Sequence, residues 1–237
     1  MISVYFALAP AGYAVFTLWS ALPTRNPARR TRLLQATLNT AFRSMHSLLR
    51  GLRILHFDPR ATSGRIPDGP CVLVANHPTL TDVSALLATV HPLAFPVKPE
   101  LFGRFWVKHL LSRAGAFEGP GTNPFSVDRF IRAGVDRASR GDRVLVFPEG
   151  TRSPEHGLGP FGRAPFEIAV QANVPVVPIA ITCEPRWLTK KSGFLDPPEV
   201  VPVLRLRVLP AIEPGAAGSS SRTLRDIVLQ RIRAETK

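Results

Sequence analysis

Residues 71–82 of the chain, CVLVANHPTLTD, run from a predicted strand through a turn into a predicted helix. The first five of these residues are apolar and typical of a buried strand. Residues 83–90 are rich in Ala and Leu and indicate a helix, with Pro78 at its first position. His77 is then expected in the turn, where it can fold back towards Asp82. Inside a regular helix, residues with this spacing would face about 140° apart.

His77 and Asp82 have the chemistry of a general base and the carboxylate that orients it. Asp82 would hold one ring N–H and fix the tautomer, so the other nitrogen could take a proton from a substrate hydroxyl. A turn histidine that only caps the helix is the alternative. The spacing alone does not separate the two, because a chain with six His has a chance of about 0.2 of showing it.

A second apolar run leads into residues 148–153, PEGTRS. Clefts of α/β sheets form at such strand ends. Gly150 lets backbone approach a ligand closely, Thr151 offers a hydroxyl, and Arg152 has a planar fork suited to phosphate or carboxylate. Glu149 can orient that Arg or a neighbouring residue. The alternative is a surface turn with a solvated pair of Glu149 and Arg152.

The two motifs, in this order and each after a strand, resemble those of the glycerolipid acyltransferase family, which includes lysophosphatidate and other lysophospholipid acyltransferases. The resemblance covers roughly residues 70–185, and Lys98 also looks like a family position. The matching blocks are Asn76, His77 and Asp82, then residues 147–152, and later residues 174–179.

The resemblance implies direct transfer of a fatty acyl group from an acyl thioester to the hydroxyl of a lysophospholipid such as lysophosphatidate. The thioester would be acyl-CoA or acyl carrier protein, acting as co-substrate. His77 would deprotonate the hydroxyl, and Asp82 would stabilise the imidazolium that forms. Arg152 would pair the anionic group of the acceptor. The substrate-binding positions implied by the family are Asn76, Lys98, Glu149, Gly150, Thr151 and Arg152.

The second family block departs from the pattern. Many members have Gly followed a few residues later by Arg, whereas residues 115–120, GAFEGP, contain no Arg. The same chemistry on another acceptor, such as an aryl-polyene headgroup or an aminolipid, is therefore an alternative. Residues 182–192 look similar to acyltransferases associated with bacterial aryl-polyene lipid pathways. A third interpretation is a noncatalytic membrane lipid-binding protein, in which His77 and Asp82 merely cap a helix.

Residues 1–24 are predicted to anchor the chain in a membrane. Residues 1–23 contain no charged side chain, and at about 1.5 Å per residue they are long enough to span the hydrocarbon. Pro10 and Gly12 leave a re-entrant helix as the alternative to a full crossing. Arginines follow this segment and none precedes it. That order disfavours a cleaved signal peptide and predicts a bacterial inner-membrane protein with its catalytic domain on the cytoplasmic side.

Residues 25–57 are predicted to form a basic amphipathic helix. Leucines recur at near-helical spacing, with arginines between them. The helix could lie on the membrane surface or pack its Leu stripe on the domain core. The net charge of +13 favours an anionic partner. We expect an anionic bilayer surface and no nucleic acid, because no recognised nucleic-acid motif is present.

The remaining elements predict an α/β fold, a mixed and mostly parallel sheet flanked by helices, with the N-terminal membrane-anchoring segment attached. Residues 58–213 would be the acyltransferase domain, and residues 214–237 a linker followed by a C-terminal amphipathic helix. Cys71 and Cys183 are expected to be buried small hydrophobes. The Cys and His spacings contain no metal-ligand pattern, so we predict no metal and no cofactor besides the co-substrate.

Overall fold

The computed structural model describes residues 27–62, 64–103, 108, 111–189, 198–218 and 220–236. The predicted membrane anchor at residues 1–24 lies outside these residues. A search of the described helices finds none with the length and apolar character needed to cross a bilayer.

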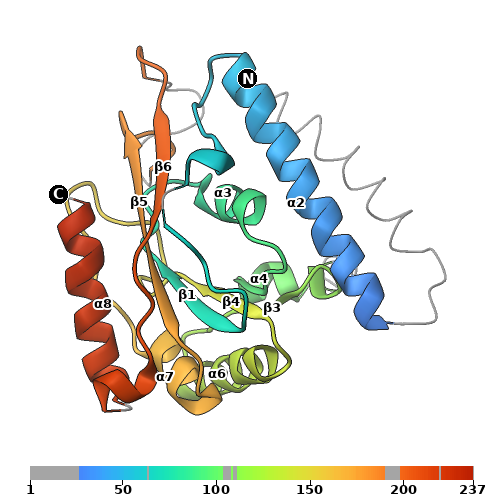
Figure 1. The fold of residues 1–237 in the computed structure, drawn as a ribbon, viewed down its shortest axis with the longest axis vertical. Helices are drawn as coiled ribbons and strands as arrows, with labels where there is room; N and C mark the ends of the chain where they lie inside the picture. Colours follow the sequence, from blue (N-terminus) through green and yellow to red (C-terminus); the bar gives the residue numbers. More distant parts are fainter. Residues whose placement is uncertain are drawn as a thin grey trace.

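The main sheet has four strands in the order β4-β1-β5-β6. β4 and β5 both pair parallel with β1, whereas β6 runs antiparallel to β5 at the edge. The predicted mixed, mostly parallel sheet is therefore confirmed (Figure 1). The strands are β1 (Cys71–Ala75), β4 (Arg143–Val146), β5 (Val176–Glu184) and β6 (Val203–Val208).

Two short parallel strands, β2 (Phe95–Val97) and β3 (Ala116–Glu118), continue this sheet beyond β4. The backbone N–H of Ala94 donates to Arg143, and the carbonyl of Ala94 accepts from Leu145, each over 2.8 Å. β2 thus begins beside β4 and runs parallel to it, so the loops after β2, β4 and β1 leave the sheet at the same edge.

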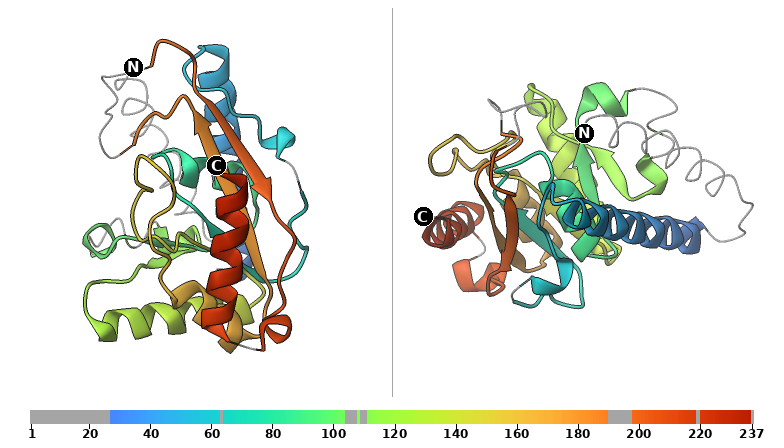
Figure 2. Two further views of the ribbon diagram at one scale, coloured as in Figure 1. Left: turned by 90° about the vertical axis from the view of Figure 1, so that its left-hand side faces the viewer. Right: turned by 90° about the horizontal axis from the view of Figure 1, so that it is seen from above.

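Helices cover both faces of the sheet, and the views in Figure 2 place α2 and α8 on opposite sides of it. The pleat explains why, since successive side chains of a strand point to opposite faces. In β1, Leu73 packs towards α3, while Val72 and Val74 pack towards the opposite helices. One face carries α2 (Pro27–Gly51), α3 (Asp82–Thr89) and α4 (Pro99–Phe102); the other carries α6 (Pro124–Ser139), α7 (Ala164–Ala172) and α8 (Ser221–Glu235).

Two 3-10 turns connect the larger elements. η1 spans Pro59–Ala61 and η2 spans Pro214–Ala217. The C-terminal helix α8 docks on the domain, because Leu224, Val228 and Ile232 are all fully buried.

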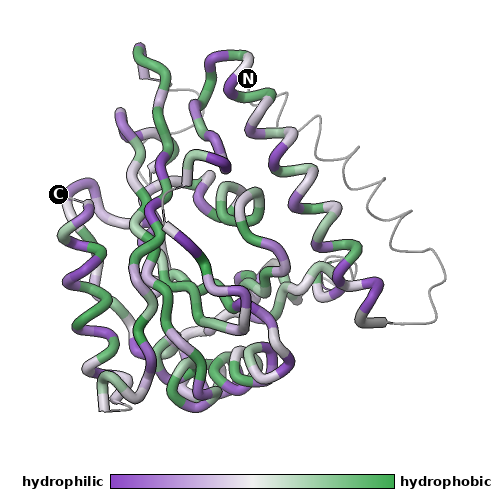
Figure 3. The backbone as a smooth tube through the Cα atoms, in the orientation of Figure 1, coloured by the Kyte–Doolittle hydropathy of each residue, from purple (hydrophilic) through white to green (hydrophobic). Residues whose placement is uncertain are grey.

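The basic amphipathic segment forms α2, which lies against α3. Leu34 and His46 on its inner face are buried. Leu33 and Leu48 are instead 43% and 44% exposed, and Leu52, directly after the helix, is 52% exposed. Polar and apolar residues alternate along the helix in Figure 3. Packing on the core thus accounts for the buried residues of the predicted stripe, such as Leu34. Contact of the outer leucines with a membrane stays a prediction.

Candidate active site

The site begins where β1 ends. The strand stops at Ala75 and α3 starts at Asp82, with Thr81 as its N-cap. The expectation that Pro78 is the first helical residue is wrong, although His77 does lie in the turn. The carboxylate of Asp82 explains the difference, because it accepts from the backbone N–H of Thr79 over 2.8 Å and so closes a turn ahead of the helix.

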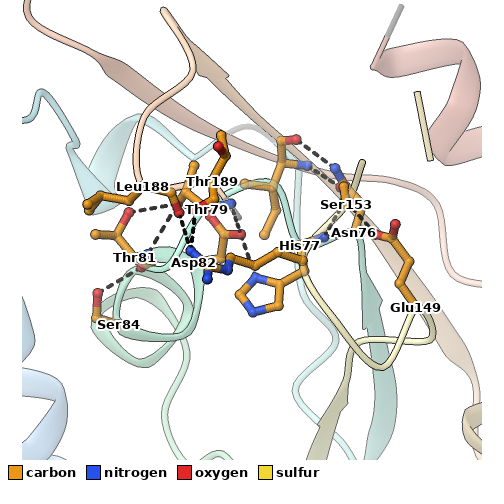
Figure 4. Close-up of polar contacts among 12 residues, drawn as sticks. Asn76, His77, Thr79, Thr81, Asp82, Ser84, Glu149, Ser153, Leu188 and Thr189 are labelled. Atoms are coloured by element: carbon orange, nitrogen blue, oxygen red, sulfur yellow. Dashed lines mark hydrogen bonds and ion pairs between the residues drawn. The ribbon is translucent and has the colours of Figure 1, made fainter. Parts of the chain in front are cut away.

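His77 and Asp82 form a dyad (Figure 4). Nδ1 of His77 lies 2.8 Å from Oδ2 of Asp82, whose side chain is fully buried, while the imidazole is 17% exposed. Donation from Nδ1–H leaves Nε2 with its lone pair free to accept a proton. This is the arrangement that a general base and its orienting carboxylate require.

Thr79 holds the other side of the carboxylate. Its hydroxyl donates to Oδ1 of Asp82 over 2.7 Å, in addition to the bond from its backbone N–H. Burial raises the pKa of Asp82, while the donors from His77 and Thr79 favour its charged form and oppose the rise. Sequence reasoning missed Thr79, although a Thr three positions before Asp matches the pattern of a helix N-terminus.

An aromatic ring packs on His77. The imidazole of His77 stacks on Phe147, with ring centroids 4.4 Å apart and the planes at 23°. Phe147 directly follows β4, the strand beside β1. The ring of His77 is thus held by a hydrogen bond at its edge and by an aromatic contact on its face.

The second motif is tied to the first through Glu149. Oε1 of Glu149 accepts from the backbone N–H of His77 over 3.1 Å and from the hydroxyl of Ser153 over 2.6 Å. Oε2 accepts from the backbone N–H of Gly159 over 2.7 Å. The carboxylate therefore holds the backbone of the turn after β1. Among the described residues it forms no ion pair with Arg152, so the solvated pair considered above is not what the structure contains.

Ser153 is a second residue that sequence reasoning missed. It is 3% exposed, its backbone N–H donates to the carbonyl of His77 over 2.7 Å, and its hydroxyl accepts from the N–H of His77 over 3.2 Å. No local sequence pattern indicates these bonds, because the two residues are 76 positions apart.

Arg152 points its guanidinium at the segment after β5. Its Nη1 donates to the carbonyls of Leu188 and Thr189 over 2.8 and 2.6 Å. The carbonyl of Leu188 also accepts from the backbone N–H of Leu80 over 3.2 Å. Arg152 thus holds the segment after β5, which in turn contacts the turn after β1 through Leu80.

Asn76 lies beneath the dyad and is 3% exposed. Its amide accepts from the backbone N–H of Ile181 over 2.8 Å and donates to the carbonyl of the same residue over 2.9 Å. It thereby extends the pairing of β1 with β5 by one position. These bonds direct the side chain into the sheet.

The other predicted binding residues lie at the surface. Lys98 is exposed between β2 and α4, and Gly150 and Thr151 are exposed in the loop after β4. Gly150 adopts a φ of 64°, a left-handed conformation that favours glycine. Lys98 and this loop follow neighbouring strands at the same sheet edge as His77.

A pocket of about 510 Å³ lies between this loop, α6 and α7. Most of its wall is apolar, and Arg163 and Glu167 stand at its polar part. Its lining includes Phe147, the residue on which the His77 ring stacks. The site therefore has an apolar recess beside it.

The two cysteines are unsuited to nucleophilic chemistry. Cys71 and Cys183 are buried and free, and burial raises the pKa of each thiol to about 11. The described residues contain no group of three or more His, Cys, Asp or Glu side chains that could hold a metal ion.

The following relatives of this chain are all named as acyltransferases. A 1-acyl-sn-glycerol-3-phosphate acyltransferase of Pseudomonas aeruginosa is 31% identical over 153 residues, which cover 59% of this chain and 54% of that protein. A lyso-ornithine lipid O-acyltransferase of the same organism is 31% identical over 169 residues, covering 69% and 60%. A chloroplastic 1-acyl-sn-glycerol-3-phosphate acyltransferase of Brassica napus is 34% identical over 114 residues, covering 48% and 33%. The chain thus spans about a third to three fifths of the length of these relatives.

A solved structure shares the fold. The crystal structure of PlsC from Thermotoga maritima, a 1-acyl-sn-glycerophosphate acyltransferase, is similar to this chain with a TM-score of 0.71 and 22% identity. The alignment covers 98% of this chain and 92% of that one. The family model described as Acyltransferase matches residues 62–182, half of the chain, and this stretch contains both loops of the site. The chain therefore belongs to the acyltransferase family.

Proposed function

We propose that this chain is a membrane-bound acyltransferase that moves a fatty acyl group from an acyl thioester to the hydroxyl of a lysophospholipid such as lysophosphatidate. The observation that carries the proposal is the 2.8 Å bond between Nδ1 of His77 and the buried carboxylate of Asp82. Membership of the family and the named activity of the relatives support the same chemistry.

The proposed reaction is a direct transfer. Nε2 of His77 takes the proton of the acceptor hydroxyl as its oxygen attacks the thioester carbonyl, and Asp82 stabilises the imidazolium. The tetrahedral intermediate then collapses, the carbon–sulfur bond breaks, and the thiolate leaves as a thiol with the proton from the imidazolium. A positioned base contributes roughly 10²- to 10⁴-fold, and holding both substrates together can contribute about 7 to 11 kcal/mol.

The acceptor's anionic group would lie between Lys98 and Arg152. Lys98 follows β2 and Arg152 lies in the loop after β4, two strands that leave the sheet at the same edge as His77, and both side chains are cationic. Nη1 of Arg152 is used by two carbonyls, so Nε and Nη2 would meet a phosphate. Gly150 and Thr151 would line the same binding site for the anionic group. Asn76 and Glu149 bond to protein groups, so they would contribute to binding indirectly, by holding the loops that the substrates contact.

The donor would be acyl-CoA or acyl carrier protein. Its apolar portion would fit the recess of about 510 Å³ that Phe147 lines. The catalytic domain would sit at the cytoplasmic face of a bacterial inner membrane. The net charge of +13 and the exposed leucines of α2 support contact with an anionic bilayer surface.

An aminolipid is a second candidate acceptor. The lyso-ornithine lipid O-acyltransferase aligns over 69% of this chain, and residues 115–120 of the second block contain no Arg. An aryl-polyene headgroup is a related alternative based on residues 182–192. In each case His77 and Asp82 would keep their roles and only the acceptor would change.

The test uses purified full-length protein in lipid or detergent. Labelled acyl-CoA or acyl carrier protein is incubated with lysophosphatidate, other lysophospholipids and lyso-ornithine lipid, and products are followed by mass spectrometry. We expect a diacyl product that His77→Ala does not form. Turnover retained in His77→Ala would overturn the general-base assignment, and transfer only to the aminolipid would favour the second candidate.

A further inference from the structure

His46 is a buried titratable residue that the proposed chemistry does not use. It projects from α2, is fully buried, and packs the edge of its ring on Phe57 with centroids 4.8 Å apart. Its Nε2 lies 3.1 Å from the hydroxyl oxygen of Ser84 in α3. Its Nδ1 is buried and has no hydrogen-bond partner within the described residues. A buried polar atom without a partner destabilises the fold, and an apolar side chain at this position would avoid that cost.

The direction of the bond to Ser84 follows from the next one. The hydroxyl of Ser84 donates to the carbonyl of Thr81 over 2.7 Å, so it has no second hydrogen for His46. His46 must therefore donate through Nε2–H, which leaves Nδ1 as the acceptor. Burial lowers the pKa of His46 to about 4, so the ring is neutral near pH 7.

Thr81 carries the link to the catalytic carboxylate. The hydroxyl of Thr79 donates to Asp82, so at the 2.8 Å contact between the two Thr hydroxyls Thr81 is the donor. The backbone N–H of Thr81 also donates to the hydroxyl of Thr79, over 3.2 Å. A continuous set of buried hydrogen bonds thus runs from α2 through Ser84, Thr81 and Thr79 to Asp82. Chains of this kind fix one arrangement of a buried site.

Other bonds between α2 and this face do not reach the dyad. Nδ2 of Asn39 donates to the carbonyl of Leu87 over 2.7 Å, nearer the far end of α3. Gln35 donates to the carbonyl of Leu93 over 3.1 Å. α2 is therefore held to the domain by several hydrogen bonds, and the bond from His46 alone among these three leads to Asp82. Asn39 therefore provides a matched control for His46.

We propose that His46 is a positioning residue, which fixes the turn of Thr79 to Asp82, and through it the ring of His77, from helix α2. The inference rests on the proposed function of the dyad. Since the chain of bonds starts on α2, the geometry of the His77 ring depends on how α2 packs on the domain. The exposed leucines lie on the outer side of the same helix.

The experiment replaces His46 in the full chain with Phe, which keeps an aromatic ring but removes the donor, and with Gln, which keeps one. Loss of the link should lower kcat about tenfold, the effect of roughly one hydrogen bond, with KM for donor and acceptor unchanged. His46→Gln should retain most of the rate. Asn39→Leu, which breaks the parallel bond between α2 and α3, should leave kcat unchanged.

Ser84→Ala tests the same link from its other end if His46→Phe does not fold. Its matched control is Thr89→Val, which removes a 2.8 Å bond from a hydroxyl to the carbonyl of Ala85 in the same helix. The inference is overturned if His46→Phe or Ser84→Ala keeps the full kcat. It is also overturned if the control variants lower kcat as much, because the effect would then be general loss of packing.

A readout without turnover separates this inference from the proposed function. The proton on Nδ1 of His77 that bridges to Asp82 should give a low-field NMR resonance that disappears in Asp82→Asn. His46→Phe should shift this resonance, and Asn39→Leu should not. A shift in an enzyme whose His77→Ala variant still turns over would support the positioning link and overturn the general base. No shift, with an inactive His77→Ala, would overturn the link alone.

Discussion

The carboxylate of Glu149 accepts a hydrogen bond from the backbone N–H of His77, 72 positions away in the sequence. The same carboxylate accepts from the hydroxyl of Ser153 and the N–H of Gly159. Three donors converge on one side chain, so the turn after β1 and the loop after β4 are held as one unit.

We expect Glu149→Gln to destabilise the protein and lower kcat. The amide has one acceptor oxygen where the carboxylate has two, so at least one of the three donors loses its partner. A hydrogen bond to a charged group contributes about 1.5–3 kcal/mol, so the free energy of unfolding should fall by about 2 kcal/mol. Chemical denaturation measures this, with Glu213→Gln, a change at an exposed position, as control. A variant with unchanged stability and only a raised acceptor KM would show that Glu149 acts on the substrate instead.

Asp82→Asn should lower kcat by about 10²- to 10⁴-fold without unfolding the protein. The variant keeps the shape of the side chain but lacks the negative charge that stabilises the imidazolium. Its single oxygen must also serve donors that two oxygens now share. Initial rates at saturating donor and acceptor, beside a thermal melt, measure both effects. A kcat within threefold of wild type would contradict the proposed role of Asp82 in the reaction.

Thr79→Val should have a smaller effect on the same carboxylate. Valine keeps the branched shape but removes the 2.7 Å bond to Oδ1 of Asp82. We expect kcat to fall by roughly tenfold, since a bond to a charged group of about 1.5 kcal/mol corresponds to that factor. Thr89→Val is the control, because it removes a hydroxyl from the same region without touching the dyad. Equal rates for the two variants would contradict the assignment.

Acid should destabilise the fold through His46. Burial lowers its pKa from 6.5 to about 4, so between these values the unfolded chain binds a proton that the native protein does not. Stability is therefore present above pH 6.5 and is lost as the pH falls towards 4. At pH 5 this loss is about 2 kcal/mol relative to pH 7.5. Denaturant melts at the two pH values measure it, and His46→Phe should show a loss smaller by this amount. An identical pH dependence in both proteins would show that His46 titrates normally.

Much of the fold could be predicted from local patterns. The apolar run at residues 71–75 forms β1 with the predicted bounds, and the alternating apolar and basic residues of β6 fit a strand that is buried on one face. Such patterns reveal which residues are buried on one or both faces of a sheet. They do not reveal the order of the strands or the antiparallel direction of β6, which depend on packing between distant segments.

The site was predictable to the extent that it is local. His77 and Asp82 are five positions apart and do meet. Ser153 could not be found in this way, because its bonds to His77 join two loops that are distant in the sequence, one bond between backbone groups and one to its hydroxyl. Arg152 illustrates the same limit, since its guanidinium goes to the carbonyls of Leu188 and Thr189, whose position follows from the tertiary fold.

The pairing of Asn76 with Ile181 has a consequence for how the protein becomes active during synthesis. These two residues are 105 positions apart, and their bonds hold the end of β1 directly before His77. A nascent chain that has not yet extended past Ile181 lacks this support, as well as the central pairing of β1 with β5. Contacts of such sequence separation form late and slowly. Assembly of the turn that holds His77 is thus delayed until the segment that contains Ile181 has left the ribosome, when β1 can pair with β5.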